Sequence, residues 1–339
     1  MEYIRPPRDD EPGTWHHVMN RGLARRTVFE TEDEIRHFLA LIARSVRKGQ
    51  IEIHVYSFLT THFHALIRSP RGELSDAMMW IESNYVRWFN RRKGRDGPLF
   101  RGRFRSRIVD TSTYWFAVVR YIDRNCVDAG LVARARDYPH GSARHYCNGH
   151  GPPWLERSVV ERRAVEWSQS TAYDSAAYEQ AFSRPPRPGL SWLVRRRVES
   201  GAAFLRRADS LDDLLRAAPS KVRARFLEHA RLADGAVSPE PIVDPDTVSA
   251  AVDGLRAAPP NWNLGTRRGR RADLFEVLRV GLLHDVCGLS QREIAAIVRG
   301  TRTNVARHQE RHRELLACND EYAVSASETV MRCVRAVYE

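Results

Sequence analysis

The sequence lacks the features of a membrane protein, a secreted disulfide-rich protein or a zinc-binding protein. Its five cysteines are odd in number and none are spaced as C-x-x-C, so neither a disulfide framework nor a zinc knuckle is indicated. No run approaches the roughly 20 apolar residues that cross a bilayer, and the opening MEYIRPPRDDEPG lacks the apolar stretch of a signal peptide. We therefore expect a soluble protein of the cytoplasm.

Lysine is also scarce. Only Lys48, Lys93 and Lys221 occur among the 54 basic residues, so arginine carries nearly all of the positive charge. Against 42 acidic residues the formal net charge is +12. The planar fork of a guanidinium group suits phosphate oxygens, which favours a nucleic-acid partner and a place with the nucleoid. High-GC coding bias would explain arginine in place of lysine, but not the surplus of positive charge.

The length and the breaks in the pattern predict more than one domain. A chain of 339 residues with 42% hydrophobic residues can form about two cores. Proline and glycine clusters at 148–153 and 258–265 interrupt helical patterns. We predict a domain over 1–147, a mainly helical linking region over 148–264 and a helical module over 265–339.

Short strand-like runs alternate with amphipathic helices in the first of these regions. WHHVMNRG predicts a strand, and TEDEIRHFLALIARSVRKG predicts a helix between an N-cap at Thr31 and a stop at Gly49. Further elements are expected as strands at 51–58, 62–68 and 100–109 and helices at 74–89 and 112–126. The order β-α-β-β-α-β-α predicts an α+β fold, a ferredoxin-like split β-α-β antiparallel sheet with helices on one face.

Two pairs of residues have spacings that suit a reactive site. The side chains of His62 and His64 project from the same face of a strand and could coordinate one divalent ion. A lone His-x-His is nevertheless often structural. Tyr121 and Asn125 are four apart, so they share one face of a helix. From the helix alone, Tyr121 could equally be a core residue beside Trp115.

Joined in order, five segments carry a family resemblance. They are WHHVMNRG, YSFLTTHFHALIRSP, NYVRWFNRR, GPLFRGRFRS and RYIDRNCVDAGLV. Together they resemble the IS200-like tyrosine transposases, and within these the group associated with repetitive extragenic palindromes. The resemblance covers Trp15 to Tyr146.

The resemblance implies a histidine-hydrophobe-histidine endonuclease. It matches His62 and His64 to paired ligands of Mg²⁺ or Mn²⁺, Asn125 to a third, amide ligand, and Tyr121 to the nucleophile. The implied activity is cleavage and rejoining of single-stranded DNA near hairpin or palindromic sequences, through a covalent 5′-phosphotyrosine. Target sequence, cleavage in cis or in trans, and self-association stay open.

The sequence departs from the family pattern at three places. Leu59-Thr60-Thr61 replaces the Pro-Asn that usually precedes the first ligand, Asp123 replaces a common histidine, and Cys126 replaces a proline. Because proline fixes the backbone, its loss can change where the tyrosine helix ends. We interpret His17 and His54 as ordinary strand histidines.

Basic residues near these motifs are candidates for contact with DNA. In FRGRFRSR four arginines alternate with other residues, so an extended chain would line them along one face beside the basic turn NRRKGRDG. The alternative is an edge strand protected by charge. The candidates are Asn20, Arg21, Arg91, Arg92, Arg101, Arg103, Arg105 and Arg107.

The last region predicts a second contact with DNA. Ser290 and Glu293 form a capping box, with Ile294, Ile297 and Val298 expected inside and Gly300 ending the helix. A following helix, capped by Thr301 or Thr303, would turn Arg302, Asn304, Arg307 and His308 outward while Val305 and Leu315 hold it down. The pattern resembles the helix-turn-helix tail of replication initiators and would contact duplex DNA, with phosphate contacts added by GTRRGRR at 265–271; a generic three-helix bundle is the alternative.

Two functions without cleavage also stay open. The first is a domesticated relative that binds palindromes and regulates without cutting. The second is a transcription regulator whose first domain is only structural.

Overall fold

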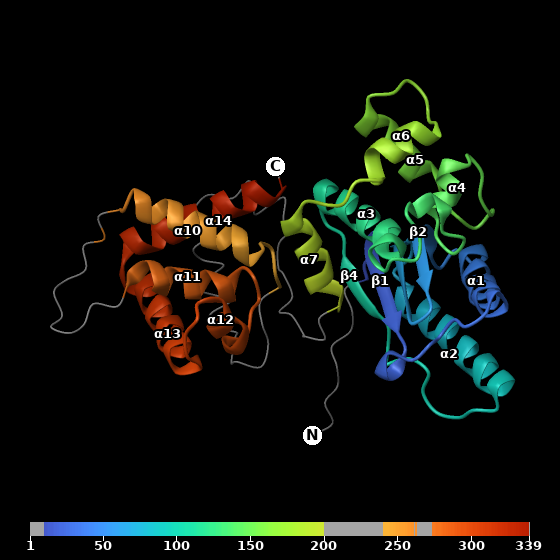
Figure 1. Ribbon diagram of the computed structural model, residues 1–339, viewed down its shortest axis with the longest axis horizontal. Coiled ribbons are helices and arrows are strands. Elements are labelled where there is room, and N and C mark those ends of the chain that lie inside the picture. Colours follow the sequence, from blue (N-terminus) through green and yellow to red (C-terminus); the bar gives the residue numbers. More distant parts are fainter. Residues whose placement is uncertain (1–9, 200–239, 261, 263–272, 339) are drawn as a thin grey trace. The chain divides into compact units, whose positions relative to one another are not determined.

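The computed structural model describes residues 10–199, 240–260, 262 and 273–338. The chain divides into two compact units, Met1–Pro186 and Arg187–Glu339 (Figure 1). The basic stretch at 265–271 lies outside the described residues, as does Lys221. Among the helices that are described, none is long and apolar enough to cross a membrane.

The first unit is built on a four-stranded antiparallel sheet in the order β2-β3-β1-β4. The strands are β1 (Thr14–Arg21), β2 (Glu52–Leu59), β3 (His62–Ser69) and β4 (Arg105–Ile108). The connection from β1 to β2 passes through α1 (Glu32–Arg47), and that from β3 to β4 passes through α2 (Leu74–Lys93). This is the predicted ferredoxin-like topology, and the α+β fold class is confirmed.

Helices α1 and α2 cover the face of the sheet to which Phe63 points. Thr31 begins α1 with a capping box closed by Glu34, as the T-x-x-E spacing indicates. Phe38 of α1 then packs against Phe63 with ring centroids 5.2 Å apart. Burial of such aromatic side chains is the main stabilising term for this layer.

Helix α3 (Ser112–Asp128) covers the other face. Its Tyr121 packs against His64, whose side chain points away from Phe63 because successive strand residues alternate. The sequence predicted that the helices lie on one face of the sheet. Helices α1 and α2 do so, whereas α3 lies on the opposite face. Cys126 is a buried residue of α3, and the helix continues past it.

Two elements differ in length from the prediction. The strand predicted over 100–109 forms only at Arg105–Ile108, because the segment before it bends at Gly102, which has a φ of +145° that favours glycine. In contrast, α2 extends through the predicted basic turn to Lys93 and ends at Gly94 in the left-handed conformation. Basic side chains in its last turn suit the negative end of the helix dipole.

The helices after α3 pack against its outer side. They are α4 (Ala143–Cys147), α5 (Ser158–Ser168) and α6 (Ser175–Phe182), with the short 3₁₀ turns η1 (Leu23–Arg25) and η2 (Ala135–Asp137) elsewhere in the unit. The rings of Phe116 and Phe182 stack at 5.5 Å. The first unit therefore extends to Pro186, past the boundary predicted at residue 147.

The described part of the second unit is helical. Its helices are α7 (Pro188–Glu199), α10 (Pro245–Ala257), α11 (Leu274–Asp285), α12 (Gln291–Ile297), α13 (Arg302–Cys318) and α14 (Asp320–Tyr338). Helices α11 and α13 meet closely at Gly281, where an added Cβ would lie 2.2 Å from the His312 ring. His312 in turn bonds to Tyr322 of α14 through Nδ1 at 2.7 Å.

Candidate active site

The predicted histidines, His62 and His64, lie on the α3 face of the sheet, in the central strand β3. Residues directly opposite in an antiparallel pair share a face. Met19 of β1 lies opposite His64 and opposite Arg105 of β4, so these side chains form one row across the sheet. His17, two residues before Met19, shares that face. A cluster of imidazoles therefore forms beneath α3.

Tyr121 packs directly on this cluster. Its ring centroid lies 5.4 Å from that of His64 and 5.8 Å from that of His17. Only 9% of Tyr121 is exposed, so the tyrosine is held between helix and sheet. Tyr121 is buried as a core residue would be, but its ring neighbours include two imidazoles of the sheet.

The second predicted pair meets at the same place. His62 Nε2 lies 3.4 Å from Asn125 Oδ1. This contact links the first residue of β3 to α3. The rings of His62 and His64 are 5.3 Å apart and perpendicular. The structure thus brings together all four residues to which the resemblance assigned chemistry, with the two from β3 more than fifty positions from the two of α3 in the sequence.

His17 is a neighbour that the sequence interpretation missed. It is fully buried, and its Nε2 lies 2.9 Å from His64 Nδ1. Burial lowers the pKa of His17 to about 3. Burial, with His17 and His62 nearby, also holds the pKa of His64 well below its usual range, so both rings are neutral at pH 7. A neutral imidazole has a lone pair for a metal ion.

The donor atoms fit a divalent ion. His64 Nε2 is buried without a hydrogen-bond partner, a costly state for a polar atom that a bound cation would relieve. Two imidazole nitrogens and an amide oxygen suit Mn²⁺ as well as Mg²⁺. In the described part of the chain, no group of three or more His, Cys, Asp or Glu side chains is arranged to hold a metal ion. The candidate ligands His62, His64 and Asn125 comprise two such residues and an amide.

Part of the predicted basic surface lies on the same face as this cluster. Arg107 is opposite His17 and Arg105 is opposite Met19, and Arg21 is opposite His62. Arg101 and Arg103 do not extend the row, because they lie in the bend before β4, where both are exposed. Arg91 and Arg92 are exposed in the last turn of α2.

Asn20 is buried and uses its amide inside the protein. Its Nδ2 donates to Glu82 Oε1 at 2.9 Å and to the carbonyl of Gly102 at 3.0 Å. The bond to Gly102 fixes the bend between Arg101 and Arg103. Asn20 therefore positions these arginines, a role that its place in the strand does not indicate from the sequence.

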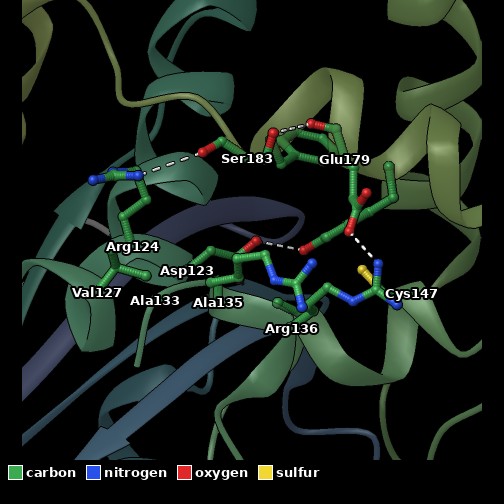
Figure 2. Close-up of a pocket in the computed structure, with 13 residues that line it drawn as sticks. Asp123, Arg124, Val127, Ala133, Ala135, Arg136, Cys147, Glu179 and Ser183 are labelled. Atoms are coloured by element: carbon green, nitrogen blue, oxygen red, sulfur yellow. Dashed lines mark hydrogen bonds and ion pairs between the residues drawn. The ribbon is translucent and has the colours of Figure 1, made fainter. Parts of the chain in front are cut away.

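A pocket of about 310 Å³ lies on the opposite side of α3, toward α4 and α6 (Figure 2). Asp123 lies in its wall and accepts a hydrogen bond from Tyr178. The arginines at its rim have acidic partners: Arg136 pairs with Glu179 and Arg124 with Asp128. Its positive charges are thus matched within the protein.

In the second unit, the predicted caps are confirmed. Ser290 and Glu293 form the capping box of α12, and the Thr301 hydroxyl accepts from Asn304 at the start of α13. Two details of the prediction are wrong. Ile297 is 41% exposed, and the chain turns at Arg299, with a φ of +51°, before it reaches Gly300.

The side chains predicted to point outward from α13 do so. Arg302, Asn304 and Arg307 are exposed and His308 is half-buried, whereas Val305 and Leu315 are buried. The helix therefore presents a polar, basic side. Its packing side is fixed by α11 and α14.

Comparison with known proteins gives a match over the first part of the chain. Residues 12–125 match the family model described as Transposase IS200 like. This matched segment is about a third of the chain and contains β1 to β4 and α1 to α3 up to Asn125. The match confirms the resemblance to IS200-like transposases over these residues, whereas the helix-turn-helix outside the matched segment stays a prediction.

Among solved structures, a transposase complex is similar to part of the chain. It is described as the REP-associated tyrosine transposase bound to a REP hairpin, with 22% sequence identity, a TM-score of 0.35, and coverage of 47% of this chain and 93% of that one. Comparison with individual curated proteins gives no match.

Proposed function

We propose that the protein is a metal-dependent transposase that cleaves and rejoins single-stranded DNA near a hairpin, with Tyr121 as nucleophile. The observation that carries the proposal is the contact of Tyr121 with His64, at 5.4 Å between ring centroids, beside the contact of His62 with Asn125. A helix and a strand that are far apart in sequence supply these groups to one place.

The chemistry follows from the groups present. The phenol oxygen of Tyr121 attacks the scissile phosphorus and loses its proton, while the bond to the 3′-oxygen breaks and that oxygen takes up a proton. The products are a 3′-hydroxyl and a 5′-phosphotyrosine. Attack by a 3′-hydroxyl on the phosphotyrosine reverses the step, so strands are exchanged without ATP. A phenol, with a pKa near 10, leaves more readily than a serine alkoxide.

His62, His64 and Asn125 would hold the divalent ion. When bound there, Mg²⁺ or Mn²⁺ acts as a Lewis acid on the phosphate. The chain itself orients the reaction: α3 places the phenol over the histidines, and Arg105 and Arg107 share the sheet face on which the phosphate backbone would lie. Arg21, opposite His62, shares this face, whereas Arg91, Arg92, Arg101 and Arg103 would contact DNA from outside the row, at the end of α2 and in the bend before β4.

We propose a second DNA contact at α13. Helix α12 is short, both α12 and α13 are capped, and a four-residue turn joins them, which suits a helix-turn-helix. Arg302, Asn304, Arg307 and His308 lie at its start, the end that enters the major groove in such motifs. This contact would add sequence choice to the nuclease, which would act with the nucleoid in the cytoplasm.

The test is a search for the covalent adduct. Purified protein is incubated with Mn²⁺ and a single-stranded hairpin oligonucleotide, labelled at its 3′ end, from the DNA that flanks the gene. On a denaturing gel the labelled DNA should migrate with the wild-type protein but not with Tyr121→Phe, because phenylalanine has no oxygen to attack the phosphorus. Tyr114→Phe removes a hydroxyl from the same helix and should keep the adduct.

The non-cleaving alternative predicts a different result. A palindrome-binding regulator would bind the oligonucleotide without an adduct in any variant. A transcription regulator with a structural first domain would also show the same Mn²⁺ affinity in wild type, His62→Ala and His64→Ala.

A further inference from the structure

Each candidate metal-binding histidine is held at its Nδ1 by a residue outside the proposed ligand set. His64 Nδ1 lies 2.9 Å from His17 Nε2, and His62 Nδ1 lies 3.0 Å from the hydroxyl oxygen of Thr61. The Nε2 atoms point elsewhere: that of His62 faces Asn125, and that of His64 is buried without a hydrogen-bond partner. The two rings thus present the same nitrogen to the site.

The fold fixes His17 in this position. It lies on β1, next to β3 in the sheet, diagonally across from His64, whose direct partner is Met19. The His17 ring also packs against His64 at 5.1 Å and against Tyr121. Because His17 is fully buried, water cannot replace it as a partner for His64 Nδ1.

Thr61 is fixed by the turn between β2 and β3. Its carbonyl accepts from the amide of Gly22 at 2.8 Å, and the carbonyl of Thr60 accepts from the amides of Val28 and Phe29. The turn is therefore tied to the segment that follows β1. This bracing places the Thr61 hydroxyl beside the ring of the next residue, His62.

We propose that His17 and Thr61 are positioning residues that stabilise the metal-binding tautomer of the two ligands, an inference that rests on the proposed metal-dependent function. In the metal-free site His62 Nε2 faces the amide oxygen of Asn125, an acceptor that favours a proton on Nε2. With the cation bound, both Nε2 atoms would need a lone pair, so His64 would donate its Nδ1–H to Nε2 of His17 and His62 would donate its Nδ1–H to the Thr61 oxygen. Without an acceptor at Nδ1, each ring would favour the tautomer protonated at Nε2, which cannot bind a metal.

The experiment measures Mn²⁺ affinity, through the electron paramagnetic resonance signal of free Mn²⁺, and does not depend on DNA cleavage. His17→Phe keeps an aromatic ring but removes the acceptor, and Thr61→Val removes the hydroxyl at nearly constant shape. Each should weaken Mn²⁺ binding by about 10- to 100-fold, the usual cost of losing such a partner. His17→Gln and Thr61→Ser, which restore an acceptor oxygen, should recover most of the affinity.

His16→Phe is the matched control. His16 is also buried on β1 but points to the other face, where its Nδ1 meets the hydroxyl of Ser106. Its Mn²⁺ affinity should equal that of wild type. Melting curves show which variants are folded, and affinities are compared only among those.

The outcomes separate the two claims. Mn²⁺ binding by wild type with equal affinity in His17→Phe and Thr61→Val would overturn the positioning role and leave the proposed function standing. No Mn²⁺ binding by wild type would overturn both. If His17→Phe does not fold, the Thr61 variants decide: a loss in Thr61→Val that Thr61→Ser recovers supports the inference, and equal affinities overturn it.

Discussion

Tyr121 and Asp123, two residues apart on α3, face different surroundings. A step of two residues turns a helix by about 200°, so Tyr121 contacts the histidines of the sheet while Asp123 lies toward α6 and bonds to Tyr178. Burial raises the pKa of Asp123 to about 7, although the bond from Tyr178 works in the opposite direction. Ionisation of a carboxyl group in this position lowers the stability of the folded protein.

This cost predicts how stability depends on pH. From the unfolded pKa of 3.8 to the folded value of about 7, the folded protein binds more protons at Asp123 than the unfolded chain does, so wild type loses stability as pH rises. Asp123→Asn keeps a carbonyl for Tyr178 and does not charge. Its melting temperature relative to wild type should therefore rise between pH 4 and 7 and level off above.

Asp128→Asn controls for the change in net charge, because Asp128 is an exposed carboxylate on the same helix. Each variant is measured against wild type by thermal unfolding at four or five pH values. A constant difference between Asp123→Asn and wild type from pH 4 to 8 would show that Asp123 is charged throughout.

The sequence indicated the candidate reactive residues but not the residues that hold them in position. His62, His64, Tyr121 and Asn125 follow from spacing and family resemblance. His17 could not be assigned, because its contact with His64 depends on which strands pair and in which register, and alternation within one strand does not contain that information. The doublet at 16–17 is the only signal that the sequence offers.

At the scale of elements, the N-termini of helices were more predictable than their C-termini or the ends of β4. The spacings S-x-x-E and T-x-x-E act locally, and both capping boxes form. The bend before β4 depends on a long-range bond from Asn20 to the carbonyl of Gly102, so the alternating arginines predicted a longer strand than the four residues that form. Local capping interactions can therefore be predicted from the sequence. Long-range contacts such as the Asn20–Gly102 bond cannot.

The proposed role of α13 leads to a prediction on duplex DNA. Replacing Arg302 and Arg307 by alanine should weaken binding to a duplex from the DNA that flanks the gene. If both side chains contact phosphates, the slope of log affinity against log salt should fall by about two, one for each contact. Fluorescence anisotropy across a range of salt concentrations measures both effects.

The charge-matched control replaces Arg332 and Arg335, which are exposed on α14. This pair should leave the salt slope unchanged. An equal fall for both pairs would mean that α13 contributes only net charge, and no fall for the α13 pair would contradict its role in contacting DNA.

At the scale of the whole molecule, the segment that matches the family model does not complete its own unit. The family match ends at residue 125, whereas the outer side of α3 is covered by later residues, with Phe116 against Phe182 and Arg120 donating to the carbonyl of Ala181. These helices fix α3, and with it Tyr121, over the sheet. Hydrophobic spacing alone did not assign them to the first unit, because it does not specify partners.

The central claim is that Tyr121 forms a covalent bond with DNA, and peptide mass spectrometry tests it most directly. Wild-type protein is incubated with Mn²⁺ and a single-stranded hairpin, then digested with nuclease and protease. The account predicts a peptide that contains Tyr121 and carries a 5′-linked nucleotide on that side chain. A nucleotide on any other residue, or none on a protein that has cleaved the hairpin, would contradict it.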